Sequence, residues 1–294
     1  MKISMTLPGM DPGLSRERLF EWCRRIEAGP FEGLAFGERM AFLNPELIAM
    51  LGACAAWTTR VRLRTTIIVM PLHHPVMLAK QLASLDVLSS GRLSVGLGIG
   101  AHDEDLQAVD ADASRQRNAK LGEEVALMRR IWAGETLPGM LLPVGPAPLQ
   151  AGGPELLAGA MGPRAVRLAA EWADGVTGFT WAVSDEEVRP IFEQARAAWS
   201  EAGRGTPRLI TGFWYALGDG ARAQLAEHLG RYMNWLPAAE REDAQRSAGL
   251  AGSPQDLRDA LRRMQDLGAD EVNLVPTCGD PEEVDRTADA LASF

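Results

Sequence analysis

The sequence predicts an α/β fold: a single (β/α)8 TIM barrel spanning residues 1–294, with insertions after the fourth and seventh strands. Apolar, strand-sized segments alternate with amphipathic helical segments, and this alternation indicates a parallel sheet covered by helices. Eight such units in 294 residues suit a closed barrel. A doubly wound open sheet is the competing fold, but the turn after the first strand, Pro8–Pro12, lacks the glycine spacing GxGxxG.

The strands are predicted from short apolar runs, and Val61–Met70 is a clear example because it is rich in β-branched residues. In chain order we expect strands at Lys2–Leu7, Gly33–Phe36, Val61–Met70, Leu93–Leu97, Leu156–Ala160, Gly175–Phe179, Arg208–Ala216 and Glu271–Pro276.

A helix is predicted after each strand. Several of these helices begin at a proline, as at Pro75 and Pro163, which the first helical turn tolerates. The helices are expected at Arg16–Glu27, Pro45–Ala56, Pro75–Leu88, Leu121–Trp132, Pro163–Trp172, Glu186–Ala202, Asp256–Leu267 and Pro281–Ala292.

Two stretches exceed the minimal repeat. Gly100–Asn118 follows the fourth strand and is polar and charged, and Leu217–Pro254 follows the seventh and includes a predicted helix around Ala221–Trp235. Both lie on the face where barrel active sites form, so we interpret them as lid or substrate-pocket segments, with decorative insertions as the alternative. A third irregular stretch, Gly134–Pro154, is rich in proline and glycine.

Composition excludes several classes of protein. The formal net charge is −9 without a basic stripe, which argues against a nucleic-acid partner. Three widely spaced cysteines without a CxxC motif fit neither a disulfide framework nor a zinc site, so we expect no metal and a reducing, cytoplasmic location. The N-terminal segment has no long apolar run, and no stretch approaches a membrane span, so neither a secretory signal nor a membrane protein is expected.

The predicted carboxyl ends of the strands, where barrel active sites lie, are poor in catalytic side chains. They offer no Ser-His-Asp set, no carboxylate pair and no metal-ligand cluster, and they are rich in glycine and apolar residues. Such a barrel mouth suits a planar cofactor that carries the reactivity itself.

Two glycine-containing motifs each allow two interpretations. Gly96–Gly100 alternates glycine with apolar residues, which permits close approach of a ring or a tight packing layer in the barrel. Gly162-Pro163-Arg164 leaves backbone N–H groups at a helix start, which fits a phosphate site or an ordinary strand-to-helix turn.

The histidines and aromatic residues are assigned by position. His73 and His74 are interpreted as residues at a helix start without a partner, whereas His102 follows the fourth strand directly and is a candidate for ligand contact. The run Asp103–Asp105 allows a metal or ribityl contact, or a solvated loop. The residues expected to form a pocket wall are Phe179, Trp181, Trp214 and Tyr215, and those expected in the core are Trp132, Trp172 and Trp199.

Three stretches resemble motifs of the luciferase-like monooxygenase family. Pro71–Leu93 (PLHHPVMLAKQLASLDVLSSGRL) is similar to a PL-x-HP start, an AK-x-LA-x-LD helix and an LS-x-GR turn, and it continues into Val95–Gly100 (VGLGIG), similar to the family's fourth strand. Ala158–Gly175 resembles the family's GPkA…aDG segment, and Gly252–Glu271 its closing motif. The resemblance spans essentially the whole chain in the expected order.

The resemblance implies a barrel that binds reduced flavin mononucleotide (FMN) or the deazaflavin coenzyme F-420. Flavin users activate oxygen, and deazaflavin users move a hydride to or from a substrate carbon. It also implies a non-proline cis peptide bond at Thr66–Ile67, give or take one residue. By carry-over, the cofactor-binding residues are Thr66, Ile67, Gly98 and Gly100 for the ring, and Ala160, Met161, Gly162 and Arg164 for the phosphate.

One position departs from the family. Many members have an Asp-His or Glu-His pair after the second strand, whereas this chain has Glu38-Arg39. Arg39 is not an acid–base group near pH 7, although it suits an acidic substrate or the carboxylated tail of the deazaflavin. Glu38 is either a base or a salt-bridge partner. The catalytic candidates are therefore Glu38, Arg39 and His102.

Two functional classes follow from this resemblance. The first is an oxidoreductase that acts on a small organic substrate by hydride transfer or flavin-mediated oxygenation, with a flavin reductase as partner in the second case. The alternative is a flavin-binding barrel that has lost catalysis together with the histidine. Because family members are frequently dimers, we also expect a homodimer.

Overall fold

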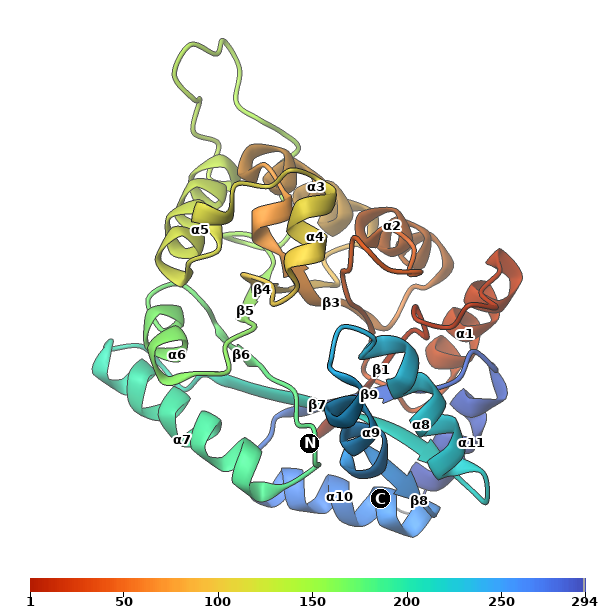
Figure 1. Cartoon of the computed structure of the whole chain (residues 1–294). Coiled ribbons are helices and arrows are strands. Elements are labelled where there is room, and N and C mark those ends of the chain that lie inside the picture. Colours follow the sequence, from red (N-terminus) through yellow and green to blue (C-terminus); the bar gives the residue numbers. More distant parts are fainter. Residues whose placement is uncertain (293) are drawn as a thin grey trace.

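The computed structural model of the chain describes residues 1–292 and 294 and confirms the (β/α)8 barrel. Its parallel strands pair in the order β6-β5-β4-β3-β2-β1-β9-β7, and β6 pairs with β7 to close the ring (Figure 1). The barrel strands are β1 (Lys2–Thr6), β2 (Gly33–Phe36), β3 (Arg62–Val69), β4 (Leu93–Gly98), β5 (Glu155–Ala158), β6 (Gly175–Thr177), β7 (Arg208–Leu217) and β9 (Glu271–Pro276).

Helices surround this barrel and bury their apolar faces against it. Side chains cap the N-termini of several of these helices. The Ser15 hydroxyl accepts the Arg18 N–H, and Ser253 forms a capping box with Asp256. The outer helices are α1 (Arg16–Ala28), α2 (Leu47–Trp57), α3 (Pro75–Leu88), α5 (Asn118–Trp132), α6 (Pro163–Ala169), α7 (Asp185–Glu201), α10 (Pro254–Asp266) and α11 (Glu282–Leu291). The expected core tryptophans Trp132, Trp172 and Trp199 are buried.

Both insertions contain more regular structure than predicted. After β4, the expected polar segment forms α4 (Asp103–Ala108) and the 3-10 turn η2 (Ala113–Arg115). After β7, the predicted helix is α8 (Ala221–Tyr232), and it is followed by α9 (Ala238–Ser247) and by β8 (Leu250–Gly252), which pairs with the end of β7. This second insertion packs on β7 through a small hydrophobic cluster, formed by Trp214 and Ala216 of β7 together with Ala221, Leu225, Leu229, Met233 and Ala248.

The barrel interior contains a buried ion pair that the sequence analysis did not identify. Arg64 of β3 and Glu271 of β9 are both 1% exposed, and the guanidinium donates to both carboxylate oxygens. Burial alone would raise the pKa of Glu271, but the Arg64 guanidinium outweighs it and lowers that pKa. The pair sits toward the amino-terminal ends of the strands and therefore supports the barrel rather than its mouth.

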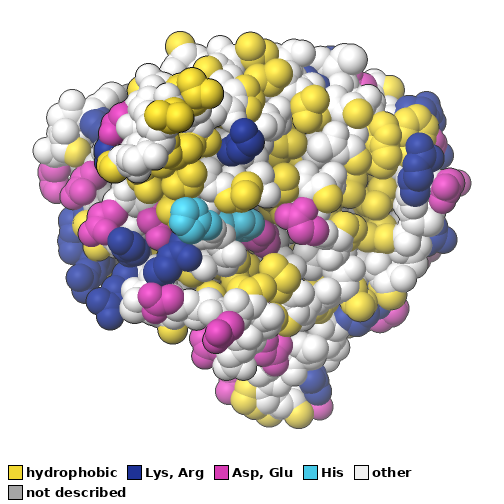
Figure 2. Space-filling model, turned by 90° about the horizontal axis from the view of Figure 1, so that it is seen from above, with side chains coloured by type: hydrophobic (Ala, Val, Ile, Leu, Met, Phe, Trp, Pro, Cys, Tyr) yellow, Lys and Arg dark blue, Asp and Glu magenta, His cyan; other side chains and the backbone are white. Residues whose placement is uncertain are grey.

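The stretch Gly134–Pro154 leaves the body of the molecule between α5 and β5 as a projecting loop (Figure 1). Leu141 in this loop is 98% exposed. Seen from the side of this loop, apolar side chains are spread over much of the surface, with charged side chains and histidines among them (Figure 2). The loop returns to the body where Asp86 accepts the N–H groups of Leu149 and Gln150.

Candidate active site

A cavity of about 340 Å³ opens at the carboxyl ends of the strands. It is lined by the segments that follow β1, β2, β5 and β6, by the ends of β3, β7 and β9, and by α8 of the second insertion. This volume lies within the usual range of small-molecule sites. The cavity is the site that the barrel architecture predicts, because it is bounded by loops from several strands.

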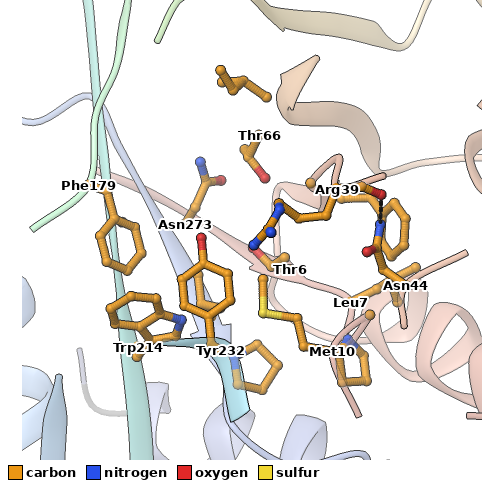
Figure 3. A pocket seen from close by; sticks show the side chains of 18 of the residues that line it. Thr6, Leu7, Met10, Arg39, Asn44, Thr66, Phe179, Trp214, Tyr232 and Asn273 are labelled. Carbon is orange, nitrogen blue, oxygen red and sulfur yellow. Dashed lines mark hydrogen bonds between the residues drawn. The ribbon is translucent and has the colours of Figure 1, made fainter. Parts of the chain in front are cut away.

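Three of the expected cofactor-binding residues line this cavity: Thr66, Ile67 and Met161. The Thr66–Ile67 peptide bond is cis, at the expected position. The pairing of β3 with β4 shifts register between Thr65 and Ile68, so the strand bulges here. The bulge brings Thr66 and Ile67 to the cavity wall, where Figure 3 shows Thr66.

Gly98 and Gly100 lie beneath this wall rather than on it. A β-carbon on Gly98 would collide with Ile67 Cδ1, and one on Gly100 would lie 2.6 Å from Val69 Cγ1. Gly100 also has a φ of +74°, which favours glycine. The glycines therefore make room for the side chains of β3, which supports the packing-layer interpretation of Gly96–Gly100.

Ala160, Gly162 and Arg164 lie beside the cavity at the start of α6. Gly162 is the N-cap of this helix, no side chain caps it, and a β-carbon there would meet nothing within 4 Å. Arg164 is exposed in the first turn, and Ala160 is buried. Backbone N–H groups at such an open helix start are free to bind an anion. The phosphate site stays a prediction.

Glu38 lines the cavity, but both of its oxygens are engaged. Oε2 accepts the Val69 N–H at 2.6 Å, and Oε1 lies 2.8 Å from His73 Nε2. The side chain is 5% exposed. The expectation that His73 has no partner is therefore wrong, because the turn after β3 folds back onto the end of β2. In this arrangement Glu38 has the geometry of a salt-bridge partner.

Arg39 forms a buried ion pair with Asp105 of α4. Arg39 Nε lies 2.6 Å from Asp105 Oδ2, and Asp105 Oδ1 accepts the N–H groups of Met40 and Ala41 at 2.9 and 2.7 Å. Of the acidic run Asp103–Asp105, Asp105 thus holds the loop after β2, whereas Asp103 and Glu104 are exposed. This carboxylate therefore holds the first insertion against the loop after β2, which lines the cavity.

The Arg39 guanidinium points into the cavity (Figure 3). Its Cζ lies 5.4 Å from the ring centre of Phe42 and 5.8 Å from that of Tyr232, and its Nη1 is buried without a hydrogen-bond partner among the described residues. Three other lining residues also present a buried polar atom without such a partner: Thr6 Oγ1, Asn44 Oδ1 and His228 Nε2. Unpaired buried polar atoms are costly, and their gathering in one cavity makes it a candidate ligand site.

Aromatic side chains form the opposite wall. Phe179 and Trp181 both pack edge-on against Trp214, with ring centres 4.4 and 5.3 Å from it. Tyr215 was also expected in this wall, which is wrong: its hydroxyl lies 2.7 Å from Thr287 Oγ1 on the helix side of β7. Neighbouring residues of a strand face opposite sides, so Trp214 and Tyr215 cannot both face the cavity.

The two histidines of the insertions lie in different surroundings, and His102 does not have the ligand contact expected of it. His102 begins α4 and packs edge-on against Trp235 and Tyr232, with ring centres 5.3 and 6.2 Å away, outside the cavity lining. Burial, followed by the Arg39 charge, lowers its pKa. His228 does line the cavity; burial, followed by Arg231, lowers its pKa to about 4, so the ring is neutral at pH 7.

The described residues that line the cavity offer no ready nucleophile. Cys278 lines it, but burial raises the pKa of this thiol to about 11, so it is protonated at neutral pH. Among the described residues, no group of three or more His, Cys, Asp or Glu side chains is placed to hold a metal ion.

Within residues 1–292 and 294, no helix is both long enough and apolar enough to cross a membrane.

Fold and site together define a class of protein: a closed (β/α)8 barrel with an aromatic, glycine-supported ligand cavity at its mouth. The sequence model of the luciferase-like monooxygenase family matches residues 4–293. The chain therefore belongs to this family.

Two relatives are similar to this chain in sequence. A protein of Mycobacterium tuberculosis, described as uncharacterised, is 33% identical over 171 residues, which cover 54% of this chain and 58% of that protein, so the chain aligns with little more than half the length of this relative. The oxygenase component of the flavin-dependent trigonelline monooxygenase of Acinetobacter baylyi is 24% identical over 87% of this chain and 81% of that protein.

Two solved structures share the fold. Monooxygenase RslO1 from Streptomyces bottropensis has a TM-score of 0.81 at 24% identity, covering 99% of this chain and 98% of that chain. An F420-dependent secondary alcohol dehydrogenase in complex with an F420-acetone adduct has a TM-score of 0.78 at 17% identity, covering 98% and 97%.

Proposed function

We propose that the chain is an oxidoreductase that binds a reduced flavin or coenzyme F-420 at the barrel mouth and acts on a small organic substrate. The observation that carries the proposal is the cavity itself: beyond the partly exposed Asp11, its described lining residues offer no acid, base or nucleophile that is both free and charged. Glu38 is bonded through both oxygens, Cys278 is a neutral thiol and His228 is a neutral imidazole. Such a site needs a bound group to supply the chemistry.

The residues present fit a planar cofactor with a phosphate tail. Thr66 and Ile67 offer a backbone wall on one side of the cavity, and it is faced by Phe179, in the segment after β6, and by Trp214 of β7. At the start of α6, Gly162 and Arg164 offer open N–H groups and a cation for the phosphate. Bound there, the cofactor would supply hydride transfer or, for a flavin, oxygen activation.

The protein's own contribution is binding, orientation and the exclusion of water. Tyr232 of α8 lies beside Arg39 at the edge of the cavity, so the second insertion covers the mouth. The Arg39–Asp105 pair fixes the loop after β2 against α4, which keeps the guanidinium in one place. Water exclusion strengthens every polar contact inside the cavity.

The choice between the two cofactors stays open in this proposal, because relatives of both kinds share the fold. For a flavin, a reductase partner is proposed by analogy with the relative described as an oxygenase component. A homodimer is proposed from the family resemblance. The second candidate function is a flavin-binding barrel without catalysis, favoured by Arg39 at the position where many members have histidine.

The test is a paired titration of purified apo-protein with FMN and with F-420, followed by tryptophan fluorescence. Saturable binding of one cofactor supports the proposal and selects the chemistry. Binding of neither, well above cellular concentrations, would overturn it. A single-turnover assay then separates the two candidates: if no acceptor and no oxygen speeds reoxidation of the bound cofactor, the barrel is a non-catalytic binder.

A further inference from the structure

The cavity has two unlike walls. Figure 3 shows Phe179 and Trp214 on one side, Arg39 and Asn44 on the other, and the Tyr232 ring between them. The aromatic wall suits the flat, apolar body of a ligand. The opposite wall holds the buried polar atoms that lack partners, Arg39 Nη1 foremost among them.

Arg39 is the single lysine or arginine among the described residues that line the cavity. Its side chain is 8% exposed, and Asp105 engages only Nε. The two acidic lining residues do not accept a hydrogen bond from Arg39 Nη1. Glu38 is bonded to Val69 and His73, and Asp11 accepts the Gly13 N–H. A buried guanidinium N–H without an acceptor is costly, and a ligand acceptor would remove that cost.

The charge balance narrows the class of ligand. A phosphate dianion would need further cations, which the described lining residues do not include, whereas the unbonded side of one guanidinium suits a single carboxylate. A carboxylate also matches the planar fork of a guanidinium. Tyr232, whose ring stacks near Arg39, closes the same end of the cavity.

We propose that the substrate is a flat, mainly apolar molecule with one carboxylate, which Arg39 binds through Nη1 while Phe179 and Trp214 cover its body. This inference rests on the proposed function, since it names the substrate class of the same site. Arg39 thereby has a binding role in place of the acid–base role of a histidine at that position.

The test compares trans-cinnamate with trans-cinnamamide, two probes of equal size that differ in charge. Their affinities are measured by isothermal titration calorimetry, with the apo-protein and with whichever cofactor it binds. We expect cinnamate to bind about 10- to 100-fold more tightly than the amide. We expect the double variant Arg39→Gln/Asp105→Asn to lose this preference, because it removes both charges of the pair and leaves neither buried alone.

Three further variants complete the design. Arg262→Gln removes an exposed guanidinium on α10 and should leave the preference unchanged. Asp105→Asn keeps Arg39 but removes its counter-charge, so cinnamate should bind more tightly. Arg39→Lys retains the charge without the planar fork and should show a smaller loss than the double variant. Thermal melts verify that each variant is folded.

Equal affinities for acid and amide, or unchanged cinnamate binding in Arg39→Gln/Asp105→Asn, would overturn the inference even if a cofactor binds. A fall in cofactor affinity in place of cinnamate affinity would also overturn it, because Arg39 would then hold the cofactor tail. If cinnamate binds through Arg39 but neither cofactor binds, the carboxylate site stands and the proposed oxidoreductase function fails.

Discussion

Arg39 Nε and Asp105 Oδ2 lie 2.6 Å apart, and both side chains are more than nine-tenths buried. The pair joins the loop after β2 to α4, an element of the first insertion. Asp105 also holds the Met40 and Ala41 N–H groups, so one carboxylate fixes both the charge and the backbone of this loop.

The first prediction concerns Asp105→Ala. This change leaves the Arg39 charge buried without its partner and two N–H groups without an acceptor, so the free energy of unfolding should fall by about 3–5 kcal/mol. Chemical denaturation at pH 7 measures it, with Asp103→Ala on the exposed side of the same helix as the control. A loss below about 1 kcal/mol would show that the pair does not organise the loop.

The second prediction concerns acid sensitivity through Glu271. Its pKa is lowered from the ordinary 4.5 because Arg64 outweighs the effect of burial. A lowered pKa gives stability that is complete above pH 4.5 and is lost as the pH falls below it. Glu271→Gln should lower the free energy of unfolding by about 3–5 kcal/mol at pH 7, since it leaves Arg64 buried without a counter-charge. The variant should also lose less stability than the wild type as the pH falls below 4.5. Urea denaturation from pH 7 to pH 3.5 tests this, and a loss of stability below pH 4.5 as steep as in the wild type would contradict it.

The third prediction concerns Glu283, through which the free energy of unfolding should change with pH in the opposite direction. Burial raises the pKa of Glu283 to about 7 from 4.5, although Arg286 acts against it. The folded state then binds more protons than the unfolded state, so the free energy of unfolding should decrease as pH rises from 4.5 to 7, by up to about 3 kcal/mol. Glu283→Gln should remove this decrease, whereas exposed Glu282→Gln should retain it. The same dependence in Glu283→Gln would refute the assignment.

The fourth prediction tests the support under the cavity wall. Gly98→Ala places a methyl group against Ile67 Cδ1, which should destabilise the fold by about 1–3 kcal/mol and weaken cofactor binding, because Thr66 and Ile67 must move. Ile67→Val removes the colliding atom, so the double variant should recover most of the loss. Thermal melts and cofactor titration measure both effects. Additive losses would show that the two residues are not coupled.

The barrel could be predicted because each strand and helix shows its own pattern. Elements without such a pattern were missed: α9 buries none of its residues, so no apolar periodicity reveals it. The predicted strand Gly175–Phe179 ends at Thr177, since Gly178 and Thr180 bond to β7 outside the regular ladder. The ends of elements depend on their neighbours.

The site was harder to predict because its pairs join distant loops. His73 and Glu38 are 35 residues apart, and Arg39 and Asp105 are 66 apart, so only closure of the barrel brings them together. The resemblance pointed to the cis bond at Thr66–Ile67, and the structure has it there. His228 was given no role by the sequence analysis, because a histidine on an amphipathic helix does not reveal which space it faces.

The second insertion packs on Trp214 and Ala216 of β7 through a hydrophobic cluster that is separate from the main core of the barrel. Exchanging residues 218–252 for the matching segment of a relative should therefore alter the part of the mouth that holds Tyr232 and His228, as long as the new segment still covers Trp214. Substrate preference can therefore change through this segment alone, and a variant library for new substrates is best built there.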